Sequence, residues 1–365
     1  MPELNELPLA ALHVDLGARM VPFAGWNMPV QYPMGVMGEH QHTRTASGLF
    51  DVSHMGQVIL RGPNAAAALE TLVPADIVGL GEGRQRYALF TNPEGGILDD
   101  LMVADRGDHL FLVVNAACAE QDIAHMQAHL PALGVTVEVI SDRALLALQG
   151  PGSEAALATL LPETAAMRFM DVAILGDIWV SRSGYTGEDG YEISVPAAKA
   201  EAFARQLLAI DAVKPIGLGA RDSLRLEAGL CLYGHDIDTT TTPNDAALMW
   251  SIGKARRAGG ARAGGFPGAE LILSATPARQ RVGLLPEGRA PMREGVALFA
   301  SAEGGEAIGK ITSGSFGPTL GAPMAMGYVP TALAATGTQL WGDVRGKRLP
   351  VKVAPLPFVP AGFKR

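Results

Sequence analysis

The sequence predicts an α+β protein in which a duplicated ferredoxin-like core is followed by a small C-terminal β-barrel. Three observations lead to this prediction: a sequence repeat, a hairpin pattern after each copy of it, and a change of composition near residue 276. The chain has 365 residues, and a chain of this length usually forms more than one domain, each with its own hydrophobic core. Its 48% hydrophobic and 18% charged residues are typical of a folded globular protein.

The repeat relates residues 60–74, LRGPNAAAALETLVP, to residues 148–162, LQGPGSEAALATLLP. Nine of the fifteen positions are identical at a constant offset of 88. Each copy follows a strand-like run, and its Gly-Pro pair marks a turn into an Ala- and Leu-rich helix. We therefore expect pseudo-repeats at about residues 50–140 and 141–230, within a first region that spans residues 1–275.

A β-hairpin pattern follows each copy of the repeat. RYALFTN and ILDDLMVA flank the turn PEGG, and DIWVSRSG and YEISVP flank the turn YTGEDG. A helix-like segment comes after each hairpin, which predicts two ferredoxin-like units. Aligning the two turns places Gly95 with Gly187 and Asp100 with Glu192. We expect these two carboxylates to face one pocket between the halves; the alternative, that each is solvated on an outward strand face, stays open.

Three later segments have patterns of their own. Residues 218–230, LGARDSLRLEAGL, predict a helix, and the Gly- and Ala-rich basic stretch 253–268 predicts a linker or mobile loop. From about Arg279, short strand-like segments alternate with Gly and Pro turns. That alternation is typical of a small β-barrel, to which we assign residues 276–365.

Charge and composition disfavour several classes of protein. The formal net charge is −8, so an acidic surface would repel nucleic acid. No run of about 18 apolar residues predicts a membrane span, and the acidic N-terminus does not resemble a secretory signal. Two isolated cysteines, Cys118 and Cys231, suit a reducing compartment. We expect a cytoplasmic protein.

The histidines predict no metal site. His40 and His42 are two positions apart in an apparent helix over residues 34–47, so they point in nearly opposite directions and cannot share one ion with His54. GEDG lacks the ligand spacing of a calcium loop, and no strand–GxGxxG–helix fingerprint of a dinucleotide site occurs.

Beyond these patterns, eight segments together resemble the T-protein (aminomethyltransferase) family of the glycine cleavage system. The resemblance runs from near the N-terminus into the C-terminal region. The segments are FAGWNMPVQY (23–32), ASGLFDVSHMGQ (46–57), GGILDDLMV (95–103), LVVNAA (112–117), SGYTGEDGYEISV (183–195), GLGARDSLRLEAG (217–229), LYGHDIDTTTTP (232–243) and ITSGSFGPTLG (311–321).

The resemblance implies an enzyme that uses tetrahydrofolate as its cosubstrate. A lipoylated carrier, the H-protein of the glycine cleavage system, would deliver an aminomethyl group on its dihydrolipoyl arm. The products would be 5,10-methylenetetrahydrofolate and ammonia, and the reaction would require neither a metal nor a covalent enzyme intermediate.

The resemblance also implies roles for particular residues. Asp100 would sit beside the reactive folate nitrogens, where it could orient the folate, stabilise positive charge or relay a proton. Glu192 and Arg221 would bind the pterin, because a carboxylate can accept two adjacent N–H bonds and a guanidinium has fixed donor geometry. Asp99, on the other strand face, is expected to be a structural turn or surface acid. Further folate-contact candidates are Tyr87, Met55, Asn115, Tyr185 and Phe363.

Three other functions remain open at this point. One is a different folate enzyme on the same scaffold, such as a demethylase or the folate region of a sarcosine-oxidising protein. The second is a folate-binding assembly factor, although such relatives carry a Cys-containing motif where this chain reads SGYTGEDGYE. The third is a binding or structural protein without catalytic activity.

Overall fold

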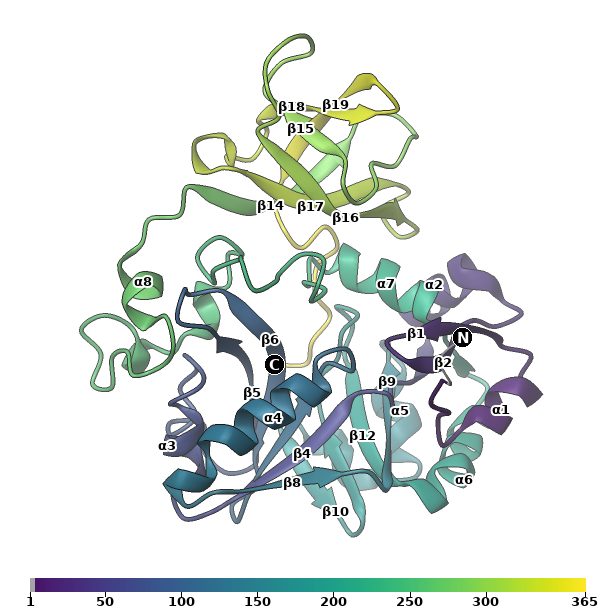
Figure 1. Ribbon diagram of the computed structural model, residues 1–365. Helices are drawn as coiled ribbons and strands as arrows, with labels where there is room; N and C mark the ends of the chain where they lie inside the picture. Colours follow the sequence, from purple (N-terminus) through teal and green to yellow (C-terminus); the bar gives the residue numbers. More distant parts are fainter. Residues whose placement is uncertain (1–3) are drawn as a thin grey trace.

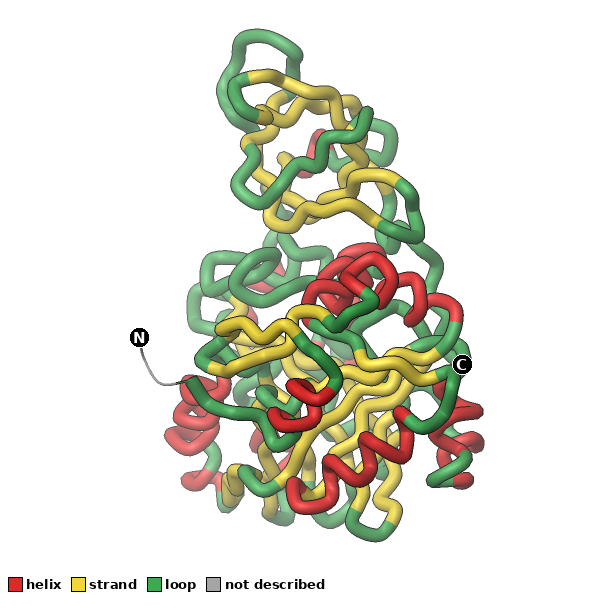
Figure 2. The backbone as a smooth tube through the Cα atoms, turned by 90° about the vertical axis from the view of Figure 1, so that its right-hand side faces the viewer, coloured by secondary structure: helices red, strands yellow, loops and turns green. Residues whose placement is uncertain are grey.

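A computed structural model describes residues 4–365 of the protein. Two sheets with their helices fill the lower part of the molecule, and a closed β-barrel stands above them (Figure 1). Figure 2 shows helices and loops between the barrel and the sheets. The predicted fold class, an α+β core with a C-terminal barrel, is confirmed. Within the described residues no helix has both the length and the apolar character that crossing a membrane requires.

The first sheet is built from residues 56–140. Its elements are β4 (Gly56–Arg61), α3 (Ala65–Leu69), β5 (Arg84–Thr91), β6 (Ile97–Asp105), β7 (Leu110–Val114), α4 (Ala119–His129), the 3₁₀ turn η1 (Pro131–Leu133) and β8 (Thr136–Ile140). The strands lie in the order β5-β6-β7-β4-β8, and every neighbouring pair is antiparallel.

The second sheet repeats this plan with one extra strand. Its elements are β3 (Ser47–Asp51), β9 (Arg143–Gln149), α5 (Ser153–Ala158), η2 (Pro162–Ala166), β10 (Val172–Leu175), β11 (Ile178–Ser181), β12 (Gly190–Pro196), α6 (Ala197–Leu208) and β13 (Val213–Pro215). The order is β10-β11-β12-β9-β3-β13, so β3 is inserted between the strands that correspond to β4 and β8.

This topology confirms the duplication but corrects the alignment of the two hairpins. In each half, a strand and a helix are followed by three antiparallel strands, so β6 corresponds to β11 and β7 to β12. Asp100 lies on β6 and Glu192 on β12, and the expected equivalence of these two residues is therefore wrong by one strand. The error came from β10, a four-residue, partly exposed strand that joins β11 through a tight turn at Gly176.

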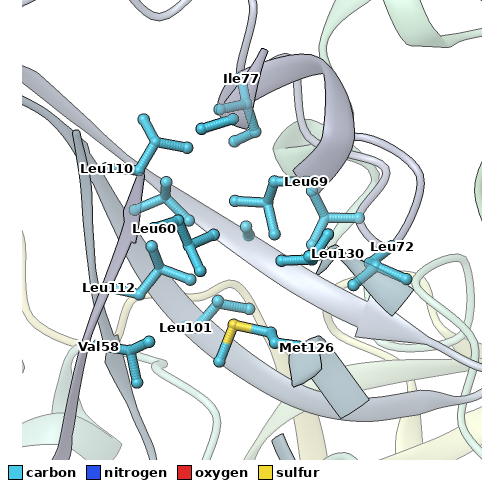
Figure 3. Close-up of a cluster of buried hydrophobic side chains, with 14 of the residues drawn as sticks. Val58, Leu60, Leu69, Leu72, Ile77, Leu101, Leu110, Leu112, Met126 and Leu130 are labelled. Atoms are coloured by element: carbon cyan, nitrogen blue, oxygen red, sulfur yellow. The ribbon is translucent and has the colours of Figure 1, made fainter. Parts of the chain in front are cut away.

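Apolar side chains join each sheet to its helices. Leu60, Leu101 and Leu112 of the first sheet pack with Leu69 of α3 and Met126 of α4 (Figure 3). Each is at most 2% exposed, and burial of such a side chain stabilises the fold by about 1.5–3 kcal/mol. A second core of the same kind joins β9 and β12 to α5 and α6.

The opposite faces of the two sheets turn toward each other. Ala104 and Phe111 of the first sheet pack with Trp179 of the second. Because side chains alternate along a strand, Asp100 shares the face of Ala104, whereas Leu101 points to the helices. The alternation of β6 therefore directs Asp100 into the space between the halves.

Helices α2 and α7 lie between the sheets and the barrel. The N-terminal elements are α1 (Ala10–Asp15), β1 (Arg19–Phe23), β2 (Trp26–Gln31) and α2 (Gly35–Thr45), and α7 (Leu218–Glu227) follows the second sheet. α2 and α7 pack against each other. They confirm the helices expected over residues 34–47 and 218–230, as α4 and α6 confirm the helices expected after the hairpins.

The segment between α7 and the barrel is ordered, which corrects the expectation of a linker or mobile loop at residues 253–268. It contains η3 (Met249–Ser251), η4 (Lys254–Arg256) and α8 (Ala269–Ser274). Arg256 is buried and its Nη1 lies 3.1 Å from Oε2 of Glu70, and Arg262 also pairs with Glu70. The buried carboxylate of Glu70 requires cations nearby, so the basic residues hold this loop on the first half.

The barrel has six strands in the closed order β14-β17-β16-β15-β18-β19. Its elements are β14 (Arg279–Pro286), β15 (Ala297–Phe299), β16 (Gly309–Gly317), β17 (Ala322–Pro330), η5 (Thr331–Leu333), β18 (Gln339–Val344) and β19 (Lys347–Ala354). After β19 the chain runs back to the second half, where the N–H of Gly362 donates to the carbonyl of Gly187 and the N–H of Phe169 donates to the carbonyl of Lys364.

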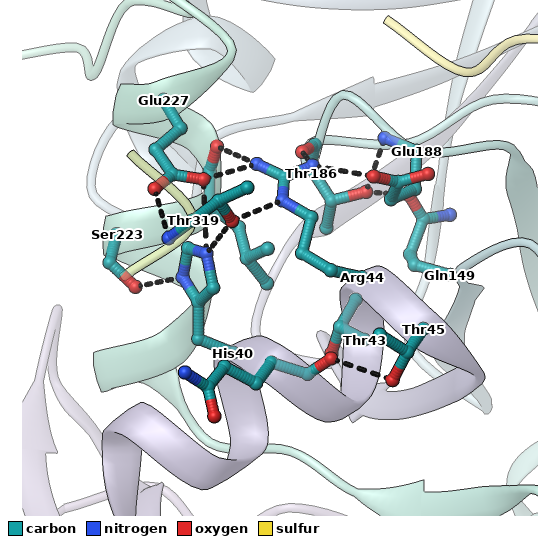
Figure 4. Close-up of polar contacts among 12 residues, drawn as sticks. His40, Thr43, Arg44, Thr45, Gln149, Thr186, Glu188, Ser223, Glu227 and Thr319 are labelled. Carbon is teal, nitrogen blue, oxygen red and sulfur yellow. Dashed lines mark hydrogen bonds and ion pairs between the residues drawn. The ribbon is translucent and has the colours of Figure 1, made fainter. Parts of the chain in front are cut away.

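Glu227, at the end of α7, joins the barrel to the core (Figure 4). Its side chain is 0% exposed and accepts hydrogen bonds from His40 at 3.0 Å and Arg44 at 2.9 Å, both on α2. It also accepts the N–H of Thr319, in the turn between β16 and β17, at 2.8 Å. One carboxylate thus connects two helices and the barrel.

Candidate active site

Asp100 is held by two neighbouring segments of the first half, the strand β5 and the turn that follows β7. Its Oδ2 accepts a hydrogen bond from the Tyr87 hydroxyl at 3.0 Å, and its Oδ1 accepts one from Nδ2 of Asn115 at 2.8 Å. Burial, followed by the negative charge of Asp99, raises the pKa of Asp100 to about 7, although both hydrogen bonds lower it. This carboxyl can therefore hold or release a proton near neutral pH.

Asp99 points away from Asp100, but the expectation of a surface acid is wrong. Its side chain is 0% exposed beneath α4. It accepts the backbone N–H of Asn115 at 3.1 Å and Nδ2 of the same residue at 2.9 Å. Strand alternation correctly predicts the direction in which the Asp99 side chain points. Its burial depends on how α4 packs on the sheet, which alternation does not reveal.

Glu192 faces the same space as Asp100 from the other half. Its Oε2 accepts a hydrogen bond from the hydroxyl of Ser183 at 3.1 Å. Glu192 and Met102 line one cavity between the sheets, and Met102 shares a strand face with Asp100. Burial raises the pKa of Glu192, while Arg221 and Ser183 lower it. The two halves thus each contribute a carboxyl group to the inter-sheet space.

Arg221 comes from the first turn of α7 and has unused hydrogen-bonding capacity. Its guanidinium lies 4.7 Å from the ring centroid of Tyr185, and its Nη1 is buried without a hydrogen-bond partner. Burial lowers the pKa of Arg221, and Tyr185 and Glu192 act in the opposite direction. Tyr185 is fixed in turn by the bond from its hydroxyl to the carbonyl of Cys231.

Two other expected residues lie outside this bonded group. Met55 is half-buried and packs, with Val113, against the apolar cluster beneath α7. Phe363 stacks on Phe169, with the ring centroids 4.2 Å apart and the planes at 12°. This stack anchors the C-terminal tail on the second half.

Sequence reasoning missed an exposed tryptophan that stacks on Tyr87, the tyrosine bonded to Asp100. Trp250 of η3 stacks on Tyr87 with a centroid distance of 5.3 Å, and it is 63% exposed. An aromatic ring with one face on a site residue and much of its surface in solvent can contact an incoming ligand. The only signal in the sequence is a lone Trp after a polar loop, because no spacing connects it with Tyr87.

His54 lies in a buried environment next to Arg221. It is 6% exposed, and its Nδ1 has no hydrogen-bond partner. Burial, followed by the charge of Arg221, lowers the pKa of His54 to about 4, so the ring is neutral at pH 7. Across residues 4–365, no three His, Cys, Asp or Glu side chains gather in an arrangement that could hold a metal ion.

Comparison with known proteins places this architecture in a family. The family model of the GCVT N-terminal domain matches residues 9–256, and that of the glycine cleavage T-protein C-terminal barrel domain matches residues 279–360. The chain therefore belongs to the glycine cleavage T-protein family, and its activity is that of an aminomethyltransferase of the glycine cleavage system.

Individual relatives match over nearly their whole length. The mitochondrial aminomethyltransferase of Dictyostelium discoideum is 44% identical and covers 100% of this chain and 94% of its own. The mitochondrial aminomethyltransferase of Gallus gallus is 46% identical and covers 99% of this chain and 94% of its own. The crystal structure of glycine cleavage system aminomethyltransferase T from Bartonella henselae superposes with a TM-score of 0.93 at 44% identity, covering 99% of this chain and 100% of that one.

Proposed function

We propose that the space between the two sheets binds tetrahydrofolate and that Asp100, Glu192 and Arg221 are its principal polar contacts. The observation that carries this proposal is that Glu192 of one half lines the inter-sheet cavity with Met102 of the other, whose strand face Asp100 shares, and that a buried Arg221 N–H lacks a partner. A buried donor without an acceptor is costly, so a ligand acceptor at this position would be stabilising.

Glu192 and Arg221 suit the pterin ring of the cosubstrate. The pyrimidinone edge of a pterin presents adjacent N–H donors, which one carboxylate can accept together. The Arg221 guanidinium would donate to a ring oxygen or nitrogen. Tyr185, whose ring lies against that guanidinium, would keep it in place.

Asp100 would face the folate nitrogens that receive the carbon. In the overall reaction two bonds form, from the carbon to N5 and N10, while its bonds to sulfur and to the amino group break. Two protons leave the folate nitrogens, and one each reaches the dihydrolipoyl sulfur and the departing ammonia. A carboxyl group that titrates near pH 7 suits the transfer of one of these protons as well as the stabilisation of positive charge on nitrogen.

The remaining candidates would shape the entrance and the walls. Tyr87 and Trp250 provide a stacked aromatic surface beside Asp100, and Asn115 orients the Asp100 carboxyl. Met55 contributes an apolar wall. For Phe363 we propose a role in anchoring the tail rather than direct contact with folate.

The carrier would be the lipoylated H-protein, with the aminomethyl group on its dihydrolipoyl arm. No metal and no nucleic acid enters this proposal. A cytoplasmic location is proposed on the strength of two cysteines that are both free and buried, which suits a reducing compartment, although the relatives named above are mitochondrial.

Asp100→Asn tests the proposal. The variant retains hydrogen bonding to Tyr87 or Asn115 but loses the charge and the proton, so we expect folate affinity within about tenfold of the wild type and a loss of transfer of about 100-fold or more. Fluorescence titration with tetrahydrofolate and single-turnover transfer from the loaded carrier measure the two quantities. Unchanged turnover with folate bound would remove Asp100 from the mechanism.

The carrier dependence has a separate test. Activity with S-aminomethylated carrier, and none with free methylated amines, is expected of the proposed reaction. Equal activity with a free methylated amine would instead indicate a demethylase on the same scaffold.

A further inference from the structure

A second buried carboxyl group stands behind Asp100 on the helix side of β6. Asp122 of α4 is 1% exposed and lies within hydrogen-bonding contact of Asp99, which is 0% exposed. Among residues 4–365, no ion pair joins Asp99, Asp100 or Asp122 to a Lys, Arg or His. Three acids therefore share one interior region without a cationic partner.

The hydrogen bonds show which of the two buried acids carries the charge. Two carboxylates in contact away from water cannot both be ionised, so Asp99 and Asp122 share a proton. Asp99 accepts two N–H bonds, from the backbone and the side chain of Asn115. Asp122 accepts no hydrogen bond from Asn115, and its Oδ2 has no hydrogen-bond partner. Donors stabilise an anion, so the charge belongs on Asp99 and the proton on Asp122.

The position of Asp122 near the start of α4 favours its ionised form, but this effect is smaller than that of burial. A helix N-terminus favours a negative charge nearby, yet this contribution is modest compared with the cost of burying a second carboxylate beside the first. Burial, together with the hydrogen bond and the charge of Asp99, raises the pKa of Asp122 well above its usual range.

Asn115 couples this acid pair to the proposed active site. The same Nδ2 donates to Oδ1 of Asp99 at 2.9 Å and to Oδ1 of Asp100 at 2.8 Å. The charge of Asp99 is thus fixed next to Asp100, and any change in the protonation of Asp99 alters how readily Asp100 binds a proton.

We propose that Asp122 is a positioning residue that stays protonated, donates to Asp99, and so maintains Asp99 as the charged neighbour of Asp100. The proposal deepens the role proposed for Asp100 and rests on it. No role in substrate contact is assigned to Asp122, because α4 lies on the opposite side of β6 from the inter-sheet space.

The other titratable groups around the acid pair are neutral. Burial, followed by the charge of Asp99, raises the pKa of the Cys118 thiol at the start of α4. Burial also raises the pKa of Tyr87 on β5 and of Tyr233 after α7. Burial raises the pKa of Asp99 as well, whereas its hydrogen bonds with Asp122 and Asn115 lower it, and we assign the negative charge to Asp99 on the strength of those hydrogen bonds.

Two variants of Asp122 separate this role from simple packing. Asp122→Asn keeps an N–H donor and no charge, as a protonated acid does, whereas Asp122→Leu has a similar size but no donor. With Leu, Asp99 loses its donor and takes up the proton, and Asp100 loses a negative neighbour. We expect the acidic limb of the pH dependence of kcat to move about one unit lower with Leu and less than about 0.3 unit with Asn.

The measurement is the pH profile of single-turnover transfer from the loaded carrier, with Asp108→Asn on the exposed surface as a control. Equal shifts in both Asp122 variants would mean that Asp122 is ionised and would overturn the proposal. Loss of kcat in both, with the limb unmoved, would leave only a structural role and would also overturn it.

A spectroscopic measurement tests the proton directly and does not depend on turnover. Infrared spectra of the protein labelled with ¹³C-aspartate should contain the carbonyl band of a protonated carboxylic acid at about pH 8, far above the ordinary range of an aspartate. The band should disappear in Asp122→Asn and persist in Asp108→Asn. Its absence from the wild type would overturn the proposal. If transfer activity fails while the band is present, the proposed function fails and the acid pair stands.

Discussion

Glu192 and Arg221 influence each other electrostatically without forming an ion pair in the described part of the chain. Arg221 Nη1 has no acceptor, and the hydrogen bond recorded for the Glu192 carboxylate comes from Ser183. If the two side chains formed a complete ion pair, few of their hydrogen-bond donors and acceptors would remain free for a ligand. Their incomplete pairing leaves one acceptor and one donor available for a ligand, which we propose is the pterin.

Replacing Glu192 by Gln should weaken folate binding more than it slows the chemical step. The amide keeps one acceptor but presents a donor to the N–H groups of the pterin, so we expect the Kd for tetrahydrofolate to rise about 10–100-fold, with kcat at saturation within about threefold. Glu201→Gln, on the exposed surface of α6, is the matched control. Equal losses in the two variants, or a large loss of kcat alone for Glu192→Gln, would contradict a binding role.

Among single residues, the sequence allowed better predictions of strand direction than of surroundings. Alternation correctly separated Asp99 from Asp100, but nothing in GGILDD indicates that Asp122, twenty-two positions after Asp100, covers Asp99. Trp250 was missed for the same reason. Its partner Tyr87 belongs to a distant strand, and only the folded chain brings the two rings together.

The Gly95–Gly96 turn before β6 holds a distant loop in place. The N–H of Ile97 donates to the carbonyls of Asp238 and Thr241 at 3.1 and 3.0 Å. A Cβ added at Gly96 would lie 1.8 Å from the carbonyl oxygen of Thr239, closer than any real contact. A side chain at Gly96 would therefore force this loop away from β6, the strand that carries Asp100.

Gly96→Ala should destabilise the protein by about 3 kcal/mol, because the clash involves backbone on both sides and cannot be relieved by a side-chain rotation. Gly81→Ala is the control, since its positive φ of +82° brings backbone strain but no atom lies within 4 Å of the added Cβ. Urea unfolding of both variants measures the difference. A loss for Gly96→Ala no greater than that for Gly81→Ala would show that the loop adapts.

At the level of elements, the long periodic helices and the repeated Gly-Pro turns could be predicted, and short or irregular pieces could not. β10 is four residues long and partly exposed, so its pattern is too weak to identify and the hairpin alignment shifted by one strand. Residues 253–268 have the composition of a linker, yet Arg256 and Arg262 pair with Glu70, almost two hundred positions earlier. Such long-range ion pairs leave no local signal.

For the whole molecule, Glu227 is the point where core and barrel meet. Burial alone would raise its pKa, but the hydrogen bond and charge of His40, the hydrogen bond of Thr319 and the charge of Arg44 together lower it to about 2. A group whose pKa is lower in the folded state stabilises the fold above its unfolded pKa, and this stabilisation is lost as the pH falls toward the folded value. The relevant window runs from the ordinary glutamate pKa of 4.5 down to about 2.

Glu227→Gln should cost about 3 kcal/mol or more at pH 7, since the buried Arg44 would lose one of its two carboxylate partners and keep only Glu188, and His40 would lose the carboxylate partner of its hydrogen bond. The difference from the wild type should shrink as the pH falls from about 4.5 toward 2, because the wild-type carboxylate is then protonated. Thermal unfolding of the two proteins across this range provides the measurement. A constant difference at all pH values would exclude the charge of Glu227 as its cause.

The C-terminal tail has a practical meaning for anyone who handles this protein. Backbone hydrogen bonds of Gly362 and Lys364 and the stack of Phe363 on Phe169 attach its last residues to the second half. In addition, Nζ of Lys364 lies 2.7 Å from Oε2 of Glu154. A purification tag or reporter fused directly after Arg365 would pull on this anchorage. Fusion partners are better attached through a long flexible spacer. Proteolytic removal of the tail would take away these contacts and so destabilise the second half.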